Sequence, residues 1–173
     1  MTTFLDRAPE FKANAVRGRG EPVQVSLAAL AGRWVVLVFY PRDFTSVCPT
    51  EIRELSRRAR ELRGLGAEPV AISADGLDTH RRWIAEVLGE VDLPLAADPG
   101  GEIARRYGVW LDDEEVAARG TFLVDPAGVV QFAAVYPLSV GRSVSELLRV
   151  LEALQTGEPV PAEWTPGSAT LER

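Results

Sequence analysis

A single cysteine, Cys48, stands at the end of a short polar loop and directly before a proline. The order Pro41-Arg-Asp-Phe-Thr45-Ser-Val-Cys48-Pro49 joins an apolar run to a segment with helical periodicity. Proline is favoured at the first helical position, so Cys48 is expected at or beside the helix N-cap, where unpaired N–H groups and the positive end of the helix dipole face the sulfur. Such surroundings favour a nucleophilic thiolate, and the Thr45 hydroxyl could approach the same point. Cys48 is therefore a candidate nucleophile; the alternative is a buried structural cysteine.

A nucleophilic thiolate needs a base or a cation beside it. His80 is a candidate base, but its position beside Arg81 and Arg82 on an amphipathic segment favours a surface or structural role. Arg119 and Arg142 are the candidate cations, because a guanidinium stays charged and can stabilise a thiolate or bind an oxyanion without exchanging a proton. From charge alone, a surface or inter-helix ion pair is the favoured interpretation of each arginine.

Other chemistries have little support. One cysteine and one histidine cannot supply the three or four soft ligands of a zinc site. The glycine pairs at 18–20 and 64–66 do not complete a dinucleotide-binding motif, Lys12 is far from any glycine-rich loop, and no G-x-S-x-G sequence is present. Asp43 lacks the second aspartate, two residues later, that an aspartyl nucleophile would have. We therefore expect neither a metal nor a cofactor.

The size and composition are those of one globular domain, with 173 residues, 46% hydrophobic and 25% charged. The net charge of −6 argues against general nucleic-acid binding. One cysteine cannot close a disulfide within the chain, which excludes a small disulfide-stapled secreted scaffold. The longest apolar run, 34–40, is too short to span a membrane, and residues 1–11 lack the pattern of a secretory signal. The expected location is cytoplasmic.

The elements that would position Cys48 follow from the hydrophobic pattern. The continuous apolar run 34–40 predicts a buried central strand, and apolar residues spaced by three and four predict a helix over 49–65. Further strands are expected at 69–73 and 93–97, with helices over 80–88 and 102–107.

The last third of the chain predicts a hairpin and a final helix. Strands at 121–124 and 129–136 are joined by an Asp-Pro-Ala-Gly turn, and a capping box at 143–146 precedes a helix that should end near residue 157. This order predicts an α/β fold, with a mixed central β-sheet flanked by helices on both faces. Residues 1–157 would form one domain, with 158–173 as its extended C-terminal tail.

The segment Phe39-Tyr-Pro-Arg-Asp-Phe-Thr-Ser-Val-Cys-Pro-Thr-Glu51 resembles the peroxiredoxin active-site motif P-x-x-x-T-x-x-C. The resemblance extends over most of the chain, through Trp83 after His80 and through 119–126 and 140–149. Residues 161–167 resemble the C-terminal segment of the alkyl hydroperoxide reductase C and typical two-cysteine subgroup. The resemblance implies the thioredoxin fold, which agrees with the predicted strand order.

By this resemblance, Cys48 is the peroxidatic nucleophile and Thr45 directs its hydroxyl at the peroxide. Arg119 would stabilise the thiolate and the charge that develops on oxygen, and Pro41 would shield the sulfur from solvent. Glu51 and Arg142 resemble the supporting charged pair of the family, which orients the site.

One position departs from the family pattern. In the two-cysteine subgroup, a resolving cysteine from the partner subunit precedes the Pro-Ala-x-Trp segment, and here that position is Val160. The resemblance therefore implies a two-cysteine-type scaffold with a one-cysteine mechanism, in which an external thiol reduces the Cys48 sulfenic acid. That thiol would be a thioredoxin-like protein or a low-molecular-weight thiol.

The implied activity is that of a thiol-dependent peroxidase acting on hydrogen peroxide, with organic hydroperoxides as a wider substrate range. The alternatives are a peroxide sensor or chaperone-like protein that uses the same cysteine, and a scaffold with a vestigial site. The resemblance also implies a homodimer, with a decamer as the larger assembly, and no nucleic-acid or membrane partner.

Overall fold

The computed structural model describes residues 5–172. Residues 1–4 and 173 lie outside the described residues, and with them part of the segment examined for a secretory signal. The chain divides between Arg142 and Ser143 into two units, which are described separately. No helix within 5–172 is both long enough and apolar enough to cross a membrane.

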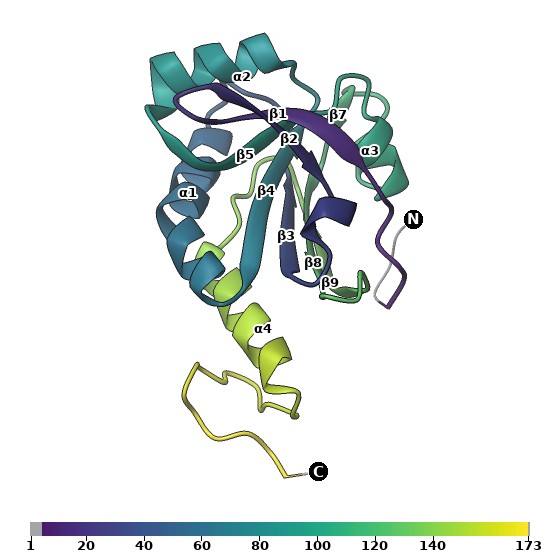
Figure 1. Cartoon of the computed structure of the whole chain (residues 1–173), viewed down its shortest axis with the longest axis vertical. Coiled ribbons are helices and arrows are strands. Elements are labelled where there is room, and N and C mark those ends of the chain that lie inside the picture. The colour runs from purple at the N-terminus through teal and green to yellow at the C-terminus, as the bar shows by residue number, and fades with distance from the viewer. Residues whose placement is uncertain (1–4, 173) are drawn as a thin grey trace. The chain divides into compact units, whose positions relative to one another are not determined.

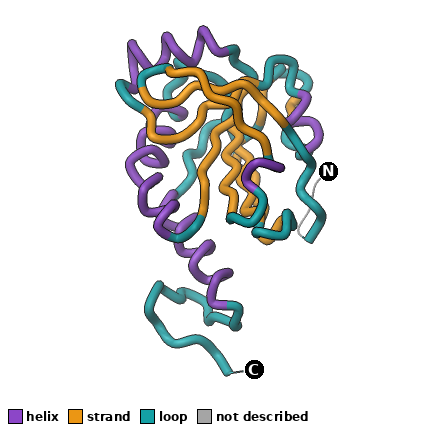
Figure 2. Tube along the Cα trace, viewed as in Figure 1, coloured by secondary structure: helices purple, strands orange, loops and turns teal. Residues whose placement is uncertain are grey.

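The first unit is built on a mixed β-sheet (Figure 2). Its described strands lie in the order β2-β1-β5-β4-β3-β8-β9. Their bounds are β1 Lys12–Gly18, β2 Glu21–Ser26, β3 Trp34–Phe39, β4 Ala67–Ser73, β5 Val91–Ala97, β8 Arg119–Val124 and β9 Val130–Tyr136. β3, β4 and β5 are parallel, whereas β8 and β9 form an antiparallel hairpin beside β3. The predicted mixed sheet is confirmed.

Helices connect the parallel strands (Figure 1). The bounds are α1 Cys48–Gly64, α2 Leu77–Trp83 with a π-helical turn η2 Ile84–Leu88, α3 Glu102–Arg106 and the 3-10 turn η1 Ala28–Leu30. Two short strands, β6 Trp110–Leu111 and β7 Val116–Ala117, pair with each other. The predicted helix 80–88 therefore begins three residues earlier and ends in a wider turn.

Alternating side chains of β3 contact both layers of helices, because successive strand residues point to opposite faces. Phe39 joins the buried cluster that contains α3, and its ring centroid lies 5.2 Å from that of Tyr107. The next residue, Tyr40, stacks on Trp83 of α2 at 5.8 Å. β3 is therefore enclosed on both faces, and the loop that follows it emerges between two layers of helices.

The sequence pattern gave no indication of the hairpin formed by β1 and β2. β1 also pairs with β5, so this hairpin extends the main sheet. The buried side chains of β1 are small, among them Ala13 and Ala15, and so the apolar signal is weak. The turn uses Gly18 and Gly20 at φ +64° and +116°, which L side chains rarely adopt.

The second unit contains α4 (Val144–Thr156). The Ser143 hydroxyl accepts the Glu146 N–H at 3.2 Å, and the helix ends at Gly157 with φ +68°, as predicted. The following segment is not extended, however, because Leu171 N–H donates to Pro159 O at 2.8 Å and closes it into a loop. The proposed domain boundary at residue 157 stays a prediction.

Candidate active site

Cys48 is the first residue of α1 and is fully buried. Val47 is the N-cap residue without a side-chain cap, and Pro49 lies in the first turn. Loop 41–47 connects β3 to α1. Thr50 Oγ1, in the first turn of α1, donates to the carbonyl oxygen of Val47 at 2.6 Å. The sulfur therefore belongs to the residue at the positive end of a long helix, where backbone N–H groups lack intrahelical partners.

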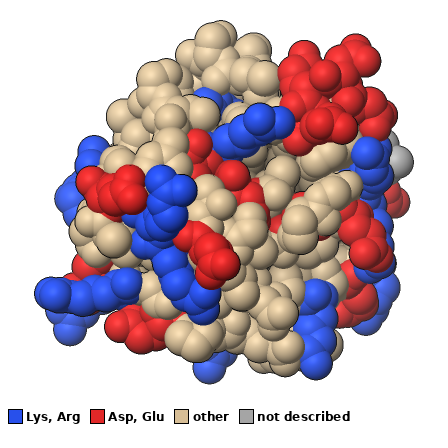
Figure 3. Space-filling model, turned by 90° about the horizontal axis from the view of Figure 1, so that it is seen from above, with Lys and Arg blue, Asp and Glu red and all other residues tan. Residues whose placement is uncertain are grey.

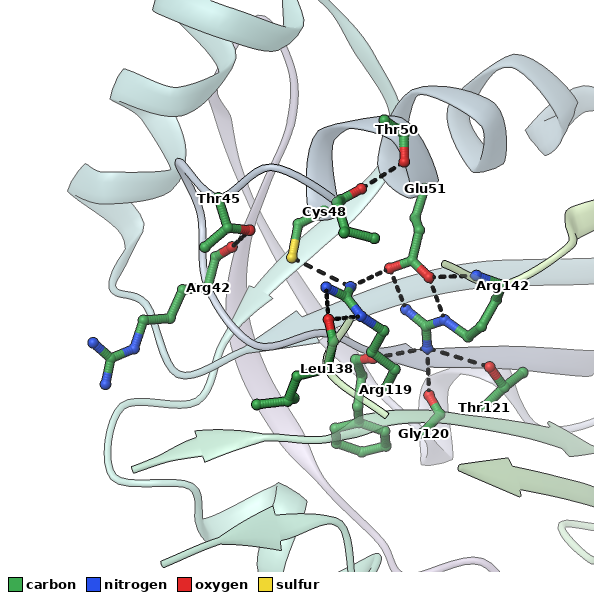
Figure 4. A network of polar contacts seen from close by, with 12 residues as sticks. Arg42, Thr45, Cys48, Thr50, Glu51, Arg119, Gly120, Thr121, Leu138 and Arg142 are labelled. Atoms are coloured by element: carbon green, nitrogen blue, oxygen red, sulfur yellow. Dashed lines mark hydrogen bonds and ion pairs between the residues drawn. The ribbon is translucent and has the colours of Figure 1, made fainter. Parts of the chain in front are cut away.

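Arg119 reaches the sulfur from β8, the strand beside β3 (Figure 4). Its Nη1 lies 3.4 Å from Cys48 Sγ and donates to Glu51 Oε2 at 2.6 Å. Its Nε and Nη2 both donate to Leu138 O, at 2.9 and 2.7 Å. The guanidinium is thus fixed on two sides, and one N–H edge faces the sulfur.

Glu51, one turn after Cys48, connects Arg119 to a second buried arginine. Glu51 Oε1 accepts from the backbone N and the Nε of Arg142, both at 2.8 Å, and Oε2 accepts from Arg142 Nη2 at 2.9 Å. Arg142 Nη1 also donates to Phe39 O and Gly120 O at 2.8 Å, and so it bridges β3 and β8. We call Arg119, Glu51 and Arg142 the arginine network.

This burial corrects the surface part of the interpretation from charge alone, which favoured a surface or inter-helix ion pair for each arginine. The side chains of Arg119 and Arg142 are only 3% and 9% exposed. Burying a guanidinium is costly unless its donors are satisfied, and here one carboxylate and three backbone carbonyls satisfy them. Neither the carboxylate partner nor the carbonyls can be recognised from local sequence.

The charge balance of the arginine network favours an anion beside it. Burial by itself would raise the pKa of Glu51, but the hydrogen bonds and charge of Arg142, together with the charge of Arg119, hold the pKa below its ordinary value of 4.5. One carboxylate faces two guanidinium groups, which leaves a positive excess next to Cys48.

Thr45 and Pro41 lie in the loop before Cys48. Pro41 is buried, whereas Thr45 is exposed and its Oγ1 donates to Arg42 O at 3.1 Å. Figure 4 shows this threonine near the sulfur, on the side away from Arg119. The hydroxyl thus donates to the backbone of its own loop, and its direction toward a substrate at Cys48 stays a prediction.

His80 is buried, which corrects the prediction of a surface residue and agrees with the structural alternative. Its Nδ1 lies 2.7 Å from Asp43 Oδ2, and Tyr40 OH donates to Asp43 Oδ1 at 2.9 Å. His80 thus contacts the active-site loop rather than the sulfur. From the sequence, Asp43 was considered only as a nucleophile, and its pairing with His80 was missed because the two residues are 37 positions apart.

Basic and acidic side chains both lie on the face drawn in Figure 3, and acidic side chains gather at its upper right. Within residues 5–172, no group of three or more His, Cys, Asp or Glu side chains is arranged to hold a metal ion.

The chain is similar to known proteins over nearly its whole length. The model of the AhpC/TSA family matches residues 5–133. Peroxiredoxin prdx-2 of Caenorhabditis elegans is 45% identical over 173 residues, which cover 95% of this chain and 86% of that protein. YkuU of Bacillus subtilis (strain 168), which also carries a peroxiredoxin name, is 45% identical over 172 residues, with 95% and 96% covered.

Solved structures of peroxiredoxins are also similar to this chain. The reduced 2-Cys peroxiredoxin of Plasmodium vivax matches with a TM-score of 0.93 and 35% identity, covering 98% of this chain and 93% of that one. The sheet with its helices is therefore the thioredoxin-like peroxiredoxin fold. With a family model over most of the chain and relatives well above 30% identity, the chain belongs to the AhpC/TSA family of peroxiredoxins.

Proposed function

We propose that this peroxiredoxin is a thiol-dependent peroxidase with a one-cysteine mechanism. The observation that carries the proposal is the 3.4 Å contact between Arg119 Nη1 and Cys48 Sγ at the start of α1. The thiolate attacks one peroxide oxygen, the O–O bond breaks, and the sulfur becomes a sulfenic acid. The other oxygen leaves with the negative charge and takes up a proton, giving water or an alcohol.

Each predicted site residue has a defined task in this step. Arg119 stabilises the thiolate and the charge that builds on the leaving oxygen, as preorganised donors do in other oxyanion sites. Thr45 directs its hydroxyl at the bound peroxide, and Pro41 shields the sulfur. Glu51 and Arg142 hold the Arg119 guanidinium, an assignment supported by the hydrogen bonds of the arginine network.

The recycling step requires another molecule. Cys48 is the only cysteine among the 173 residues, and Val160 stands where a resolving cysteine would be expected. An external thiol attacks the sulfenic sulfur, giving a mixed disulfide and water, and a second thiol then releases Cys48. Hydrogen peroxide is the primary substrate we propose, with organic hydroperoxides as further substrates, because a fully buried sulfur favours a small oxidant.

The cellular context is part of the same proposal. We place the protein in the cytoplasm as a homodimer that can assemble into a decamer, with residues 158–173 as the tail of its single domain. Analytical ultracentrifugation of the full chain would distinguish the monomer, dimer and decamer.

Intact-mass measurement tests the chemistry directly. One equivalent of hydrogen peroxide should add one oxygen atom to the wild-type chain, and Cys48→Ser should abolish the addition. Steady peroxide consumption with a panel of protein and small-molecule thiols would then identify the reductant. An unmodified wild-type chain contradicts the proposal, whereas oxidation that ends in a stable mixed disulfide without turnover favours a peroxide sensor.

A further inference from the structure

A second buried polar network, separate from the arginine network, holds the loop before Cys48. It consists of Tyr40, Asp43, Asp75 and His80, and we call it the Asp43 network. Tyr40 OH and His80 Nδ1 contact the two carboxylate oxygens of Asp43, at 2.9 and 2.7 Å. The backbone N–H of Asp43 donates to Asp75 Oδ2 at 2.8 Å. One loop residue is thereby attached to β3, to α2 and to the end of β4.

The attachment of Asp43 affects the loop because the next residue, Phe44, has an unusual backbone conformation. Phe44 has φ +55°, a left-handed conformation that is uncommon for a bulky side chain. Such a conformation persists only where the surroundings enforce it. Asp43 immediately before it is buried and held by three contacts, so the turn at Phe44 is imposed by the Asp43 network.

The helix α2 contacts this turn at two successive residues. From its buried side, His80 contacts Asp43. From its exposed side, Arg82 places its guanidinium carbon 5.5 Å from the centroid of the Phe44 ring. Thr45 comes directly after this clamped pair, and its hydroxyl closes the loop on Arg42 O. The direction of the Thr45 side chain therefore depends on how α2 holds the two preceding residues.

Among the described residues, the side chain of His80 has no polar contact other than the one to Asp43. Its Nε2 is buried without a hydrogen-bond partner, so its contribution to polar structure passes through Nδ1 and Asp43. Maintaining a histidine with one unpartnered buried nitrogen is unfavourable by itself. Its contact with the active-site loop is the one interaction that sets it apart from an apolar residue at this position.

We propose that His80 is a positioning residue, which through Asp43 orients loop 41–47 so that Thr45 meets the peroxide bound at Cys48. The inference rests on the proposed peroxidase function. It assigns the two networks different tasks: the arginine network stabilises charge at the sulfur, and the Asp43 network aligns the hydroxyl with the oxidant. Loss of His80 should therefore slow the reaction with peroxide without changing how readily the thiolate forms.

The test compares two substitutions of His80 with one control. His80→Leu removes the contact to Asp43, whereas in His80→Asn the amide nitrogen can take the place of Nδ1. Ile84→Val is the control, because Ile84 is buried in the continuation of the same helix and lies outside the network. The second-order rate constant for Cys48 oxidation by hydrogen peroxide is measured by rapid quench and intact mass.

We expect His80→Leu to lower this rate constant by about 10- to 100-fold, since misplacement of a reacting group by about 1 Å can cost that much. His80→Asn should recover most of the rate, and Ile84→Val should match the wild type. The pH midpoint of Cys48 alkylation by iodoacetamide should be the same in all four proteins. That midpoint separates alignment from a change in thiolate formation, and the rescue by Asn separates it from general loosening of the fold.

Three results would overturn the inference: an unchanged rate in folded His80→Leu, a folded His80→Asn that is as slow as His80→Leu, or a shifted alkylation midpoint that accounts for the loss. If His80→Leu does not fold, Asp43→Ala takes its place, because it removes both acceptor oxygens, and a wild-type rate there has the same meaning. Failure of the wild type to gain an oxygen would instead contradict the proposed function, so the two failures are distinguishable.

Discussion

The two buried networks around Cys48 differ in composition and in what they touch. The arginine network combines two guanidinium groups with one carboxylate and contacts the sulfur. The Asp43 network combines carboxylates with a phenol and an imidazole, and it contacts the loop. The comparison suggests that one network controls charge at the reacting atom, and the other controls the shape of the segment that leads to it.

Their electrostatics are opposite in sign. Burial raises the pKa of both central carboxyl groups, and in Glu51 the two arginines outweigh that effect, so its pKa is lowered. In Asp43 burial prevails over the hydrogen bond and charge of His80, so its pKa is raised above 3.8. Burial, followed by the charge of Asp43, also raises the pKa of Tyr40 well above its ordinary value, which keeps the phenol a donor.

The largest expected effect comes from removing the cation at the sulfur. Arg119→Met should lower the rate constant for oxidation by hydrogen peroxide by about 100- to 1000-fold, as loss of one preorganised donor does elsewhere. The pH midpoint of iodoacetamide alkylation should rise, unlike in the His80 variants. Arg57→Met is the matched control, because Arg57 is exposed on α1 and pairs with Glu54. A wild-type rate in Arg119→Met would contradict the assignment of charge stabilisation to the arginine network.

Stability should depend most on the shared carboxylate. Glu51→Gln leaves two buried guanidinium groups around a neutral amide and should lower the free energy of unfolding by about 3 kcal/mol in urea titrations. Glu54→Gln on the same helix breaks an exposed pair and should leave the urea midpoint unchanged. Equal midpoints for the two variants would show that the arginine network adds nothing to stability.

The opposite pKa shifts predict opposite pH dependences. The contribution of Glu51, measured as wild type minus Glu51→Gln, should be complete above pH 4.5 and lost as the pH falls through the lowered pKa of the folded state. The contribution of Asp43, measured as wild type minus Asp43→Asn, should instead decline as the pH rises from 3.8 through its raised pKa.

For each carboxyl group, the contribution to the free energy of unfolding changes by at most about 1.4 kcal/mol per pH unit. Urea unfolding of the wild type and of both variants is measured between about pH 3 and 5.5, a range that spans the ordinary pKa values of aspartate and glutamate. Slopes of the same sign would contradict the assignment of opposite electrostatics to the two networks.

The smallest effect is expected from a change at Tyr40 in the Asp43 network. Tyr40→Phe removes one hydrogen bond to Asp43 and should cost about 1 kcal/mol of unfolding free energy with a modest loss of peroxide rate. Tyr107→Phe also removes one hydrogen bond, from the phenol to Pro9 O at 2.9 Å. It should cost a similar free energy and leave the rate unchanged. Identical rates for the two variants would show that the loss of alignment is not specific to the loop.

Several elements of the two units were predictable because their signals are local. The apolar run of β3, the spacing of α1 and the Ser143 cap each depend on residues close in sequence. The β1–β2 hairpin was missed because its buried residues are small, and the tail was taken as extended because its prolines exclude a helix without showing where it folds back.

Within the site, the position of Cys48 at the start of a helix was predictable from local sequence, and the arginine network was not. Charge alone favoured a surface or inter-helix ion pair for Arg119 and for Arg142, and only the resemblance to peroxiredoxins placed them at the site. Neither the local sequence nor the resemblance to peroxiredoxins indicated that His80 pairs with Asp43. Asp43 and His80 meet because the end of β3 and the start of α2 lie together in the fold, a consequence of strand pairing rather than of spacing.

The sequence by itself determined that any thiol chemistry of this chain rests on Cys48, and that a helix begins there, since both follow from residue type and local backbone preference. The tertiary structure decided which charges surround the sulfur and what holds the loop before it. The contact of His80 with Asp43 joins residues 37 positions apart and that of Arg142 with Glu51 joins residues 91 positions apart, and a buried charge is tolerated only where such partners satisfy it.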